Sequence, residues 1–431
     1  MQPSPPPSAL QAQHIAAKLQ QAVAFHQKGQ LGPAHALYQE ILTLQPAHFD
    51  ALHLLGVIAA QVGNHAEALA WIDRALAVHE ASAAAHSNRG HALNDLKQHE
   101  AALRSYDRAI ELQPDFPAAH WNQGLCYLQL GDFGKGWPKH EWRWKNESTS
   151  AFRERRDFPV PLWLGEASLQ GKTILLHAEQ GLGDTIQFCR YAPLVRDLGA
   201  RVILEVQPPL MGLLSTLDGV SQLIARGDSL PAVDFHCPLL SLPLALKTGL
   251  ASVPLPKGYL HADPAKVAVW QKRLGVRTQP RVGLVWSGSA AHKNDRFRSI
   301  PLPVLMSFLD EGCQYISLQK ELRAADMQAL PAWPGLLQVT DLLTDFTETA
   351  ALCELLDVVI TVDTSVAHLA AAMGKPTWLL LPSPAEWRWM MDRNDSPWYA
   401  SMKLYRQPNP GDWVSVMNRV REDLKTLARD A

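Results

Sequence analysis

The sequence predicts an α-helical repeat array followed by two α/β lobes, each built on a parallel sheet. Two observations indicate this fold class. Small residues recur with a period of about 34 residues over residues 15–150, and this period is typical of helix pairs that stack into a solenoid. After residue 170, apolar β-rich runs alternate with helical patterns, an order that gives parallel sheets covered by helices on both faces.

Composition and charge exclude several classes of protein. The chain has 431 residues and a formal net charge of −2, so it lacks the basic excess that indicates a nucleic-acid partner. Its five cysteines are scattered and never form a CxxC pair, which argues against a disulfide framework and a zinc site. We find neither an apolar run of the roughly 20 residues that span a bilayer nor a secretion signal. These observations predict a soluble, cytoplasmic protein with no transmembrane segment and no bound metal.

The repeat is defined by three columns of small residues, with one lysine in a glycine slot. The columns are Gly29, Gly63, Lys97 and Gly131; Ala22, Gly56, Gly90 and Gly124; and Ala34, Ala68, Ala102 and Gly136. Small side chains let paired helices approach closely, and glycine at a turn between helices supplies a positive φ. The period and the columns resemble tetratricopeptide repeats, predicted as about four copies over residues 15–150 after a disordered leader of residues 1–14.

Stacked helix pairs of this kind usually present a concave face to extended peptide. We therefore expect the array to capture an acceptor protein or peptide; scaffolding or self-association into a homo-oligomer is the alternative. One column of the first helices holds His53, His86 and His120. Positions one repeat apart lie too far from each other to share a metal ion, so we expect these histidines to line the groove for the acceptor, with ordinary packing as the alternative.

The second half divides into a linker (residues 151–170), a first lobe (171–265), a second lobe (266–408) and a C-terminal helix (409–431). The predicted strands are Thr173–His177, Arg201–Val206, Arg281–Trp286, Gln314–Leu318, Asp357–Val362 and Thr377–Leu381. The simplest architecture is two Rossmann-like lobes that face each other across a cleft. In such sheets, ligands bind at the carboxyl ends of the strands.

The turn AEQGLGD follows the first strand of the first lobe and carries the candidate catalytic residues. Asp184 is placed at the edge of the sheet, and Glu179 is the reserve candidate. His177, the last residue of the strand, is the candidate for orienting the acceptor; for both, ordinary loop structure is the alternative. Gly181 and Gly183 allow the backbone to approach an acceptor closely. Gln187, on the following helix, completes this set as a candidate contact for the acceptor.

The turn DTSVAH in the second lobe is a candidate anion site. Asp363, Thr364 and Ser365 end a strand and start a helix, where free N–H groups, including that of Val366, and the positive helix end attract a phosphate. His368 lies one turn further, within reach of such a group. Satisfied capping with a packed histidine is the alternative.

The loop WSGSAAHKNDRFR follows another strand and combines small residues with positive charge. A departing diphosphate needs oriented donors and one or two cations. Spacing does not decide which of the cations Lys293, Arg296 and Arg298 does this; we take Ser287, Lys293 and Arg298 as the candidates, with a solvated surface position as the alternative for each cation.

Together, the GLGD turn, the WSGS loop and the DTSVAH turn before MGKP resemble the heptosyltransferase-type glycosyltransferases over residues 170–430. Those enzymes are inverting, are independent of metals and have the two-lobed GT-B fold. With the repeats, the chain resembles bacterial tetratricopeptide-repeat glycosyltransferases, some of which modify flagellin; the domain order is similar to that of O-GlcNAc transferase.

The resemblance implies a role for each matching residue. Asp184 corresponds to the base that activates the acceptor hydroxyl, and Asp363, Thr364, Ser365 and His368 correspond to the donor-binding turn. Ser365 departs from the usual glycine of that turn. A nucleotide-activated sugar would be the co-substrate, with no further cofactor. The segment PAEWRWMMDRNDSPWY, which contains Trp387, Arg388, Trp389 and Asp395, would help to shape the donor pocket.

Two other functions remain open at this point. An NAD-dependent enzyme would use Gly181-x-Gly183 and Glu205 as the ribose-binding acid, although Ile186 occupies the third glycine position. A non-catalytic adaptor would use the repeats to bind a partner and the α/β half as a ligand sensor or a degenerate enzyme. The donor nucleotide, the sugar and the acceptor, whether protein, lipopolysaccharide or another glycan, also stay open.

Overall fold

The computed structural model describes residues 9–291, 294–309 and 311–429, and the chain divides into two compact units. The first unit, the repeat unit, comprises Met1–Tyr127 and Pro138–Phe152. The second, the α/β unit, comprises Leu128–Trp137 and Arg153–Ala431. Among the described residues, no helix combines the length and the hydropathy that a membrane crossing needs.

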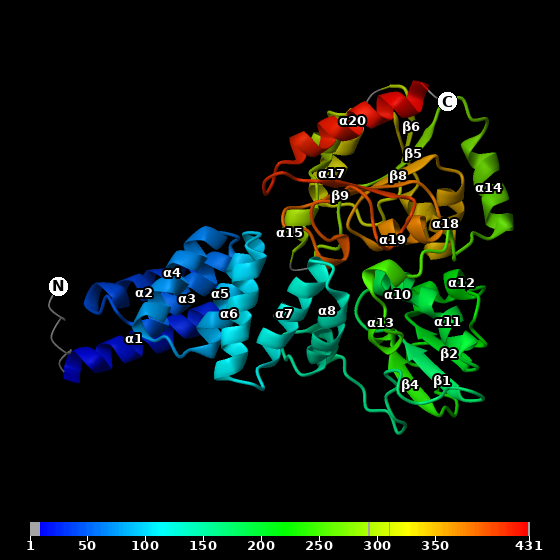
Figure 1. Cartoon of the computed structure of the whole chain (residues 1–431). Coiled ribbons are helices and arrows are strands. Elements are labelled where there is room, and N and C mark those ends of the chain that lie inside the picture. Colours follow the sequence, from blue (N-terminus) through cyan, green and yellow to red (C-terminus); the bar gives the residue numbers. More distant parts are fainter. Residues whose placement is uncertain (1–8, 292–293, 310, 430–431) are drawn as a thin grey trace. The chain divides into compact units, whose positions relative to one another are not determined.

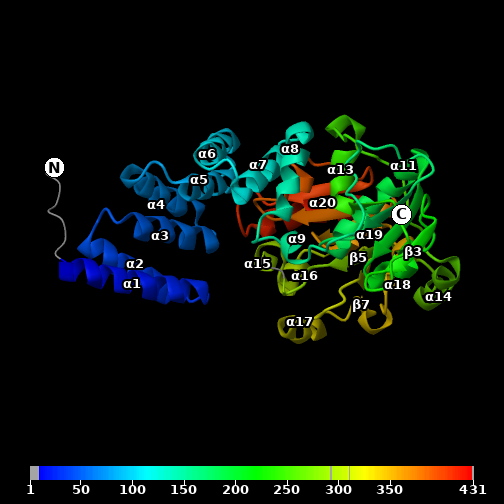
Figure 2. The same ribbon diagram turned by 90° about the horizontal axis from the view of Figure 1, so that it is seen from below.

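The repeat unit is built of consecutive helices that pack as antiparallel pairs, and neighbouring helices lie side by side in both views (Figures 1 and 2). They are α1 (Ala9–Gln27), α2 (Leu31–Leu44), α3 (Phe49–Gln61), α4 (His65–Val78), α5 (Ala83–Asp95) and α6 (His99–Leu112). Two further helices, α7 (Pro117–Gln129) and α8 (Phe133–His140), each contain residues of both units. Helix α1 begins at Ala9, so an ordered helix extends into the stretch that we expected to be a disordered leader.

The columns of small residues occur, as predicted, where paired helices pack closely and where a turn has a positive φ. A Cβ atom added to Gly90 would lie 2.6 Å from Cε1 of Tyr106, and one added to Gly56 would lie 2.5 Å from Cγ1 of Ile72. The turn column adopts the left-handed backbone conformation, with φ of 88° at Gly63 and 62° at Lys97. The lysine therefore accepts a conformation that glycine adopts more easily.

Replacing Gly90 with alanine is expected to destabilise the α5–α6 pair by about 1–3 kcal/mol, because the new methyl group overpacks the Tyr106 ring. Gly32→Ala is the matched control. Gly32 is also helical, but nothing lies within 4 Å of its added Cβ, so this change should be neutral or stabilising. Native-state hydrogen exchange of α5 and α6 measures the difference. Equal exchange in the two variants would contradict the packing argument.

The α/β unit contains two parallel sheets. The first sheet has the order β3-β2-β1-β4, and the second has the order β10-β9-β8-β5-β6-β7. The strands are β1 (Thr173–His177), β2 (Arg201–Val206), β3 (Gln222–Ala225), β4 (Phe235–Pro238), β5 (Arg281–Val285), β6 (Gln314–Ser317), β7 (Leu336–Gln338), β8 (Val358–Val362), β9 (Thr377–Leu381) and β10 (Met402–Arg406). The strand order reverses between β1 and β4 and between β5 and β8, and these switch points are where open α/β sheets bind ligands.

Helices cover the sheets as the strand–helix alternation predicts (Figure 1). They are α10 (Leu182–Phe188), α11 (Ala192–Asp197), α12 (Met211–Leu214), α13 (Leu242–Ala245), α14 (Pro264–Leu274), α15 (Asp295–Arg298), α16 (Leu302–Met306), α17 (Ala324–Ala329), α18 (Phe346–Glu354), α19 (Ser365–Ala372) and α20 (Trp413–Arg429), with the short α9 (Ser150–Arg153) before them. The predicted fold class, a helical repeat array followed by two Rossmann-like lobes, is confirmed.

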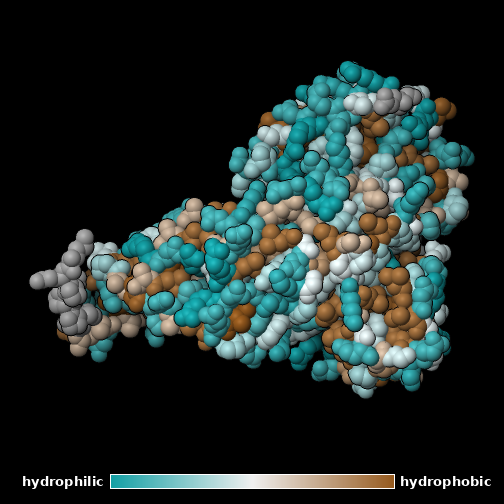
Figure 3. Space-filling model, in the orientation of Figure 1, coloured by the Kyte–Doolittle hydropathy of each residue, from teal (hydrophilic) through white to brown (hydrophobic). Residues whose placement is uncertain are grey.

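The core of the second lobe has two layers because alternate strand residues face opposite sides of the sheet. Val358 and Ile360 of β8 pack in one cluster with α16 and α20, whereas Val359 packs in another with α14 and α18. Helix α20 buries one apolar side against this sheet, and the outward surface over it is largely hydrophilic (Figure 3).

The connector before β1 is attached to the first sheet. Leu162 pairs with His236 in a parallel bridge, and the N–H of Trp163 donates to the carbonyl of His236 at 2.9 Å. Trp163 is buried. Part of the predicted linker therefore adds to the β4 edge of the first lobe.

Candidate functional site

The two lobes of the α/β unit meet at the first turns of α10 and α19, which follow the switch-point strands β1 and β8. A Cβ atom added to Gly183 would lie 2.7 Å from Cδ2 of His368. Gly183 is therefore required where one lobe packs against the other. Glycine at this position explains the close approach of two helices, in addition to the predicted approach of a substrate.

Asp184 lies at this junction and both of its carboxylate oxygens accept hydrogen bonds. Oδ2 accepts from the N–H of Gly181 at 2.8 Å, which caps the start of α10. Oδ1 accepts from the guanidinium of Arg388, which belongs to the second lobe. The side chain is only 16% exposed. The sequence placed Asp184 at the sheet edge, but nothing in its pattern indicated this ion pair.

Arg388 is the central cation of the site and lies in the 3-10 turn Trp387–Trp389. Its Nε donates to Oε1 of Gln187 at 2.8 Å, its Nη1 donates to Glu386 and its Nη2 to Asp184. The guanidinium carbon lies 4.5 Å from the centroid of the Trp387 ring. One buried guanidinium thus joins residues of both lobes, including the predicted Gln187.

The charges around Arg388 hold it in the protonated form. Burial opposes a buried cation, but Glu386, Asp184 and Asp363 together raise the pKa of Arg388. Conversely, desolvation raises the pKa of Glu386 to about 7, with contributions from Asp363 and Asp184 and with Arg388 opposing the rise. We refer to Asp184, Asp363 and Glu386 with Arg388 as the carboxylate cluster.

Asp363 directly follows β8 and connects several parts of the second lobe. Its Oδ2 accepts from Nε1 of Trp389 at 2.8 Å, and its carbonyl oxygen accepts from Nη1 of Arg298 at 2.9 Å. Burial raises the pKa of the Asp363 carboxyl, whereas Trp389 and the two arginines, Arg388 and Arg298, oppose the rise. Trp389 and Arg298, both singled out from the sequence, are thus neighbours of this aspartate.

The turn after Asp363 presents the start of α19. Oγ1 of Thr364 lies 3.2 Å from Oγ1 of Thr361, and the Thr364 side chain does not cap the helix. Ser365 and Val366 occupy the first two helical positions, where N–H groups have no partner within a helix. This geometry matches that of an anion site, and the assignment to a phosphate stays a prediction.

His368 is packed at the junction of the lobes. Its Nδ1 lies 2.9 Å from the hydroxyl of Tyr399, and its ring stacks on Trp389 with centroids 5.5 Å apart. Burial, together with Arg388 and Arg190, lowers the pKa of His368 well below its usual range. The imidazole is therefore neutral near pH 7 and supplies no positive charge to a phosphate.

Two arginines, Arg298 at the end of α15 and Arg323 just before α17, lie beside Gly288 in the loop after β5. An added Cβ on Gly288 would clash with the guanidinium of Arg298, and Nη2 of Arg323 donates to the carbonyl of Gly288 at 3.1 Å. Arg323 also pairs with Asp295. Ser287 is buried, and its N–H donates to Gln319 at 3.1 Å. Arg323 was not among the site residues predicted from the sequence. The predicted Lys293 lies outside the described residues.

The two other catalytic candidates pack within the first lobe. Oε1 of the buried Glu179 accepts from the N–H of Leu240 at 3.2 Å. Nε2 of His177 lies 3.2 Å from Nδ1 of His236, and its ring lies 4.8 Å from that of Phe158. These contacts give both side chains a structural role, and a role in catalysis stays a prediction.

The three predicted groove histidines belong to the repeat unit and bond to its own groups. Nε2 of His86 lies 2.9 Å from the carbonyl of Glu80, and Nε2 of His120 lies 2.8 Å from that of Pro114. Nε2 of His53 lies 2.9 Å from Nδ2 of Asn88. Each histidine thus joins neighbouring segments of the array, and acceptor binding by these residues stays a prediction.

Glu205, the acid that a dinucleotide-binding enzyme would use for the ribose, has a partner within the fold. It is 1% exposed and forms a two-pronged ion pair with Arg156, with Nη1 of the arginine 2.9 Å from Oε1. This ion pair gives Glu205 a structural role and does not favour a dinucleotide site.

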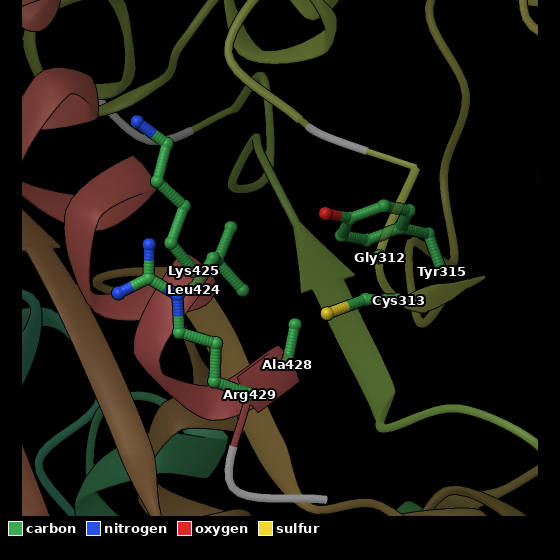
Figure 4. Close-up of a pocket in the computed structure, with 7 residues that line it drawn as sticks. All are labelled: Gly312, Cys313, Tyr315, Leu424, Lys425, Ala428 and Arg429. Carbon is green, nitrogen blue, oxygen red and sulfur yellow. The ribbon is translucent and has the colours of Figure 1, made fainter.

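Two surface cavities lie away from the cluster. One cavity of about 170 Å³ is lined by Cys313 and Tyr315 and by Lys425 and Arg429 of α20 (Figure 4). Another of about 480 Å³ lies along β10 and α20. We place the candidate site at the switch points because the charged side chains gather there and because this is where such sheets bind ligands.

Comparisons with known proteins agree with this division of the chain. Residues 19–87 match a tetratricopeptide repeat model and residues 90–131 a TPR repeat model. Residues 329–381 match glycosyltransferase family 9 (heptosyltransferase), and this segment contains β8, the turn after it, α19 and β9. The chain therefore contains tetratricopeptide repeats and, after them, a segment that is similar to the heptosyltransferase family, in agreement with the sequence motifs.

Individual proteins show more distant similarity. Protein FlbA of Caulobacter vibrioides is 26% identical over 403 residues, which cover 87% of this chain and 66% of FlbA. An O-GlcNAc transferase mutant of Thermobaculum terrenum is 15% identical, with 98% of this chain and 94% of that chain covered and a TM-score of 0.37. MamA from Desulfovibrio magneticus is 21% identical, covers 30% of this chain and 72% of its own, and gives a TM-score of 0.27.

Proposed function

We propose that this protein is an inverting, metal-independent glycosyltransferase that moves a sugar from an activated nucleotide to an acceptor hydroxyl. The observation that carries the proposal is the turn after β8. It lies inside the segment that matches glycosyltransferase family 9, and it directly adjoins a cluster of carboxylates from both lobes. An acid–base group next to an anion site is what nucleotide-dependent sugar transfer requires.

The donor side is formed by the second lobe. The N–H groups of Ser365 and Val366, with the positive end of α19, bind the phosphates of the nucleotide. Arg298 and Arg323 add positive charge next to Gly288. As the bond to the sugar breaks, negative charge grows on the leaving phosphate, and these fixed donors stabilise it without a metal ion.

The acceptor side is formed by the carboxylate cluster. The acceptor hydroxyl loses its proton to a carboxylate, which the family resemblance identifies as Asp184, and attacks the anomeric carbon from the face opposite the nucleotide. A positioned base contributes roughly 10²–10⁴-fold to such a step. Attack from the opposite face inverts the configuration at that carbon.

The tetratricopeptide repeats support a protein acceptor, because such arrays take extended peptide on their concave face. A flagellin-like protein is the acceptor we propose. Intact masses of secreted proteins from wild-type and deletion cells test it. A protein that loses the mass of one or more sugars in the deletion supports the proposal, whereas a change only in lipopolysaccharide would contradict it.

Arg298→Ala is expected to weaken binding of nucleoside diphosphates by about 10–100-fold, because a charge-assisted contact to the phosphates is lost. Arg296→Ala is the matched control, since Arg296 lies exposed on the same turn of helix. Calorimetric titration of each variant with a panel of nucleoside diphosphates measures the difference. An unchanged Kd in Arg298→Ala would remove this arginine from the donor site.

A ligand-sensing adaptor is the second candidate function. It is favoured by one observation, namely that both oxygens of Asp184 are engaged in the free protein. Nucleotide-sugar binding without release of nucleotide or transfer of sugar, under conditions of single turnover, would support the adaptor.

A further inference from the structure

In the free protein, Arg388 holds Asp184 in a contact that opposes the role proposed for this aspartate. The guanidinium binds Oδ1 and the N–H of Gly181 binds Oδ2, so both oxygens are engaged. A carboxylate that faces a guanidinium is also a weaker base than a free one, because the cation stabilises its charged form. Asp184 therefore has to be released from Arg388 before it can take a proton from an acceptor.

Arg388 is bound by three side chains in unequal ways. Glu386 binds it twice, because one carboxylate oxygen accepts from the N–H of Arg388 at 3.1 Å and the other accepts from Nη1. Gln187 accepts from Nε at 2.8 Å. The contact with Asp184 is made by Nη2. If Nη2 changes its partner, the guanidinium is still held at Nε and Nη1, and Glu386 still neutralises its charge.

Gln187 shows that the contacts around Arg388 are not fully satisfied in the free protein. Its side chain is buried on α10, and its Nε2 has no hydrogen-bond partner among the described residues. A buried donor without a partner costs free energy, and native proteins contain few such groups. A ligand that rearranges these contacts therefore meets less resistance than in a fully bonded cluster.

The guanidinium also lies beside the turn that we propose as the phosphate site. Trp389, the residue after Arg388, contacts both ends of this turn, since its Nε1 donates to Asp363 at 2.8 Å and its ring stacks on His368 with centroids 5.5 Å apart. Arg388 itself reaches Asp184 in the first turn of α10, which packs against α19. A phosphate at the start of α19 competes with Asp184 for this cation, because phosphates are strong acceptors for arginine.

Building on the proposed sugar transfer, we infer that Arg388 exchanges one anion for another. It holds Asp184 in the free protein, and it binds the phosphate of the donor in the complex, which releases Asp184 as the base. The donor consequently binds before the acceptor.

The transfer step then proceeds with the base exposed. The O–H bond of the acceptor breaks and its proton goes to Oδ1 of Asp184, while the acceptor oxygen forms the bond to the anomeric carbon. The bond from that carbon to the phosphate breaks, and its electron pair stays on the phosphate oxygen, where Arg388 stabilises the new charge. When the nucleotide leaves, Asp184 passes its proton to water and Arg388 returns to it.

Calorimetric titration of the full-length protein with a panel of nucleoside mono- and diphosphates tests this exchange. Asp184→Asn keeps an oxygen for the N–H of Gly181 but binds Arg388 less strongly, so it competes less with the phosphate. This variant should bind nucleotide roughly 5–150-fold more tightly than the wild type, the usual range of coupling between two binding events. Arg388→Gln should bind nucleotide about 10–100-fold more weakly, because a charge-assisted contact is lost.

A double-mutant cycle separates the exchange from simple repulsion between Asp184 and the nucleotide. In the Arg388→Gln background, Asp184→Asn should have no further effect under the exchange, whereas repulsion alone would still tighten binding there. Asp218→Asn, which removes an exposed partner of Arg196, is the matched control and should bind nucleotide as the wild type does. Weaker or unchanged binding by Asp184→Asn, or equal tightening in both backgrounds, overturns the inference and leaves the proposed function standing.

Labelling of carboxylates in the wild type tests the exchange even if Arg388→Gln does not fold. A carbodiimide couples glycine ethyl ester to accessible carboxylates, and mass spectrometry of peptides locates the label. Saturating nucleotide should increase labelling at Asp184 and leave the exposed Asp218 unchanged. Labelling of Asp184 that does not increase overturns the inference alone. Failure of the wild type to bind any nucleotide of the panel overturns both the inference and the proposed function.

Discussion

Arg388→Met is expected to abolish sugar transfer and to lower the free energy of unfolding of the α/β unit by about 3–5 kcal/mol. The side chain is 10% exposed, and it neutralises the carboxylates of Asp184 and Glu386. Methionine fills much of the same volume but leaves these negative charges facing each other without a cation. Loss of the guanidinium also removes two hydrogen bonds between the lobes, those from Arg388 to Asp184 and to Gln187.

Arg196→Met is the matched control for this prediction. Arg196 also pairs with two carboxylates, Asp197 and Asp218, but it is 42% exposed, and exposed ion pairs contribute little to stability because water screens them. Urea unfolding followed by tryptophan fluorescence measures both variants. Adding Glu386→Gln to Arg388→Met should recover part of the lost stability without restoring transfer. Equal stability of the two single variants would mean that Arg388 is not the cation that holds the cluster together.

Much of the fold could be predicted because the main strands are long, apolar and followed by clear turns. Strands β1, β2 and β9 have the predicted bounds, and β5, β6 and β8 differ from them by one residue. The missed strands have weaker patterns. Strands β3, β4 and β7 have only three or four residues each, and β10 alternates polar and apolar residues at the edge of its sheet. Such segments become strands through their neighbours rather than through their own sequence.

Residues of the candidate site could be predicted only where they lie in the turn between a strand and the helix after it. Asp184 and Asp363 both lie at the predicted sheet edges. Arg388 was assigned to the donor pocket, but its partner Asp184 lies 204 positions away in the sequence, and no local pattern joins the two. Glu386 and Arg323 lie outside the glycine-containing turns, so the sequence pattern of a phosphate-binding loop does not indicate them. The sequence feature that could have indicated Glu386 is a charged residue directly before the tryptophans of the segment PAEWRW.

Gly183→Ala is expected to reduce sugar transfer by more than about 100-fold by forcing the two lobes apart at the site, since a misplacement of about 1 Å costs this much. The new methyl group would lie 2.7 Å from Cδ2 of His368. That ring cannot move away easily, because Tyr399 binds its Nδ1 and Trp389 stacks on its face. The strain therefore acts on the contact between α10 and α19, which brings Asp184 to Arg388.

Hydrogen exchange locates this effect. Exchange should become faster in the first turns of α10 and α19, by an amount that corresponds to about 1–3 kcal/mol, while the two sheets keep their protection. Gly134→Ala, at an open position of α8, is the control and should leave both exchange and transfer unchanged. Adding His368→Ser to Gly183→Ala removes the ring that the methyl group meets, so protection of α10 should return. If Gly183→Ala transfers sugar at the wild-type rate, the junction of the two lobes does not set the geometry of the reaction, and the carboxylate cluster is only a structural contact.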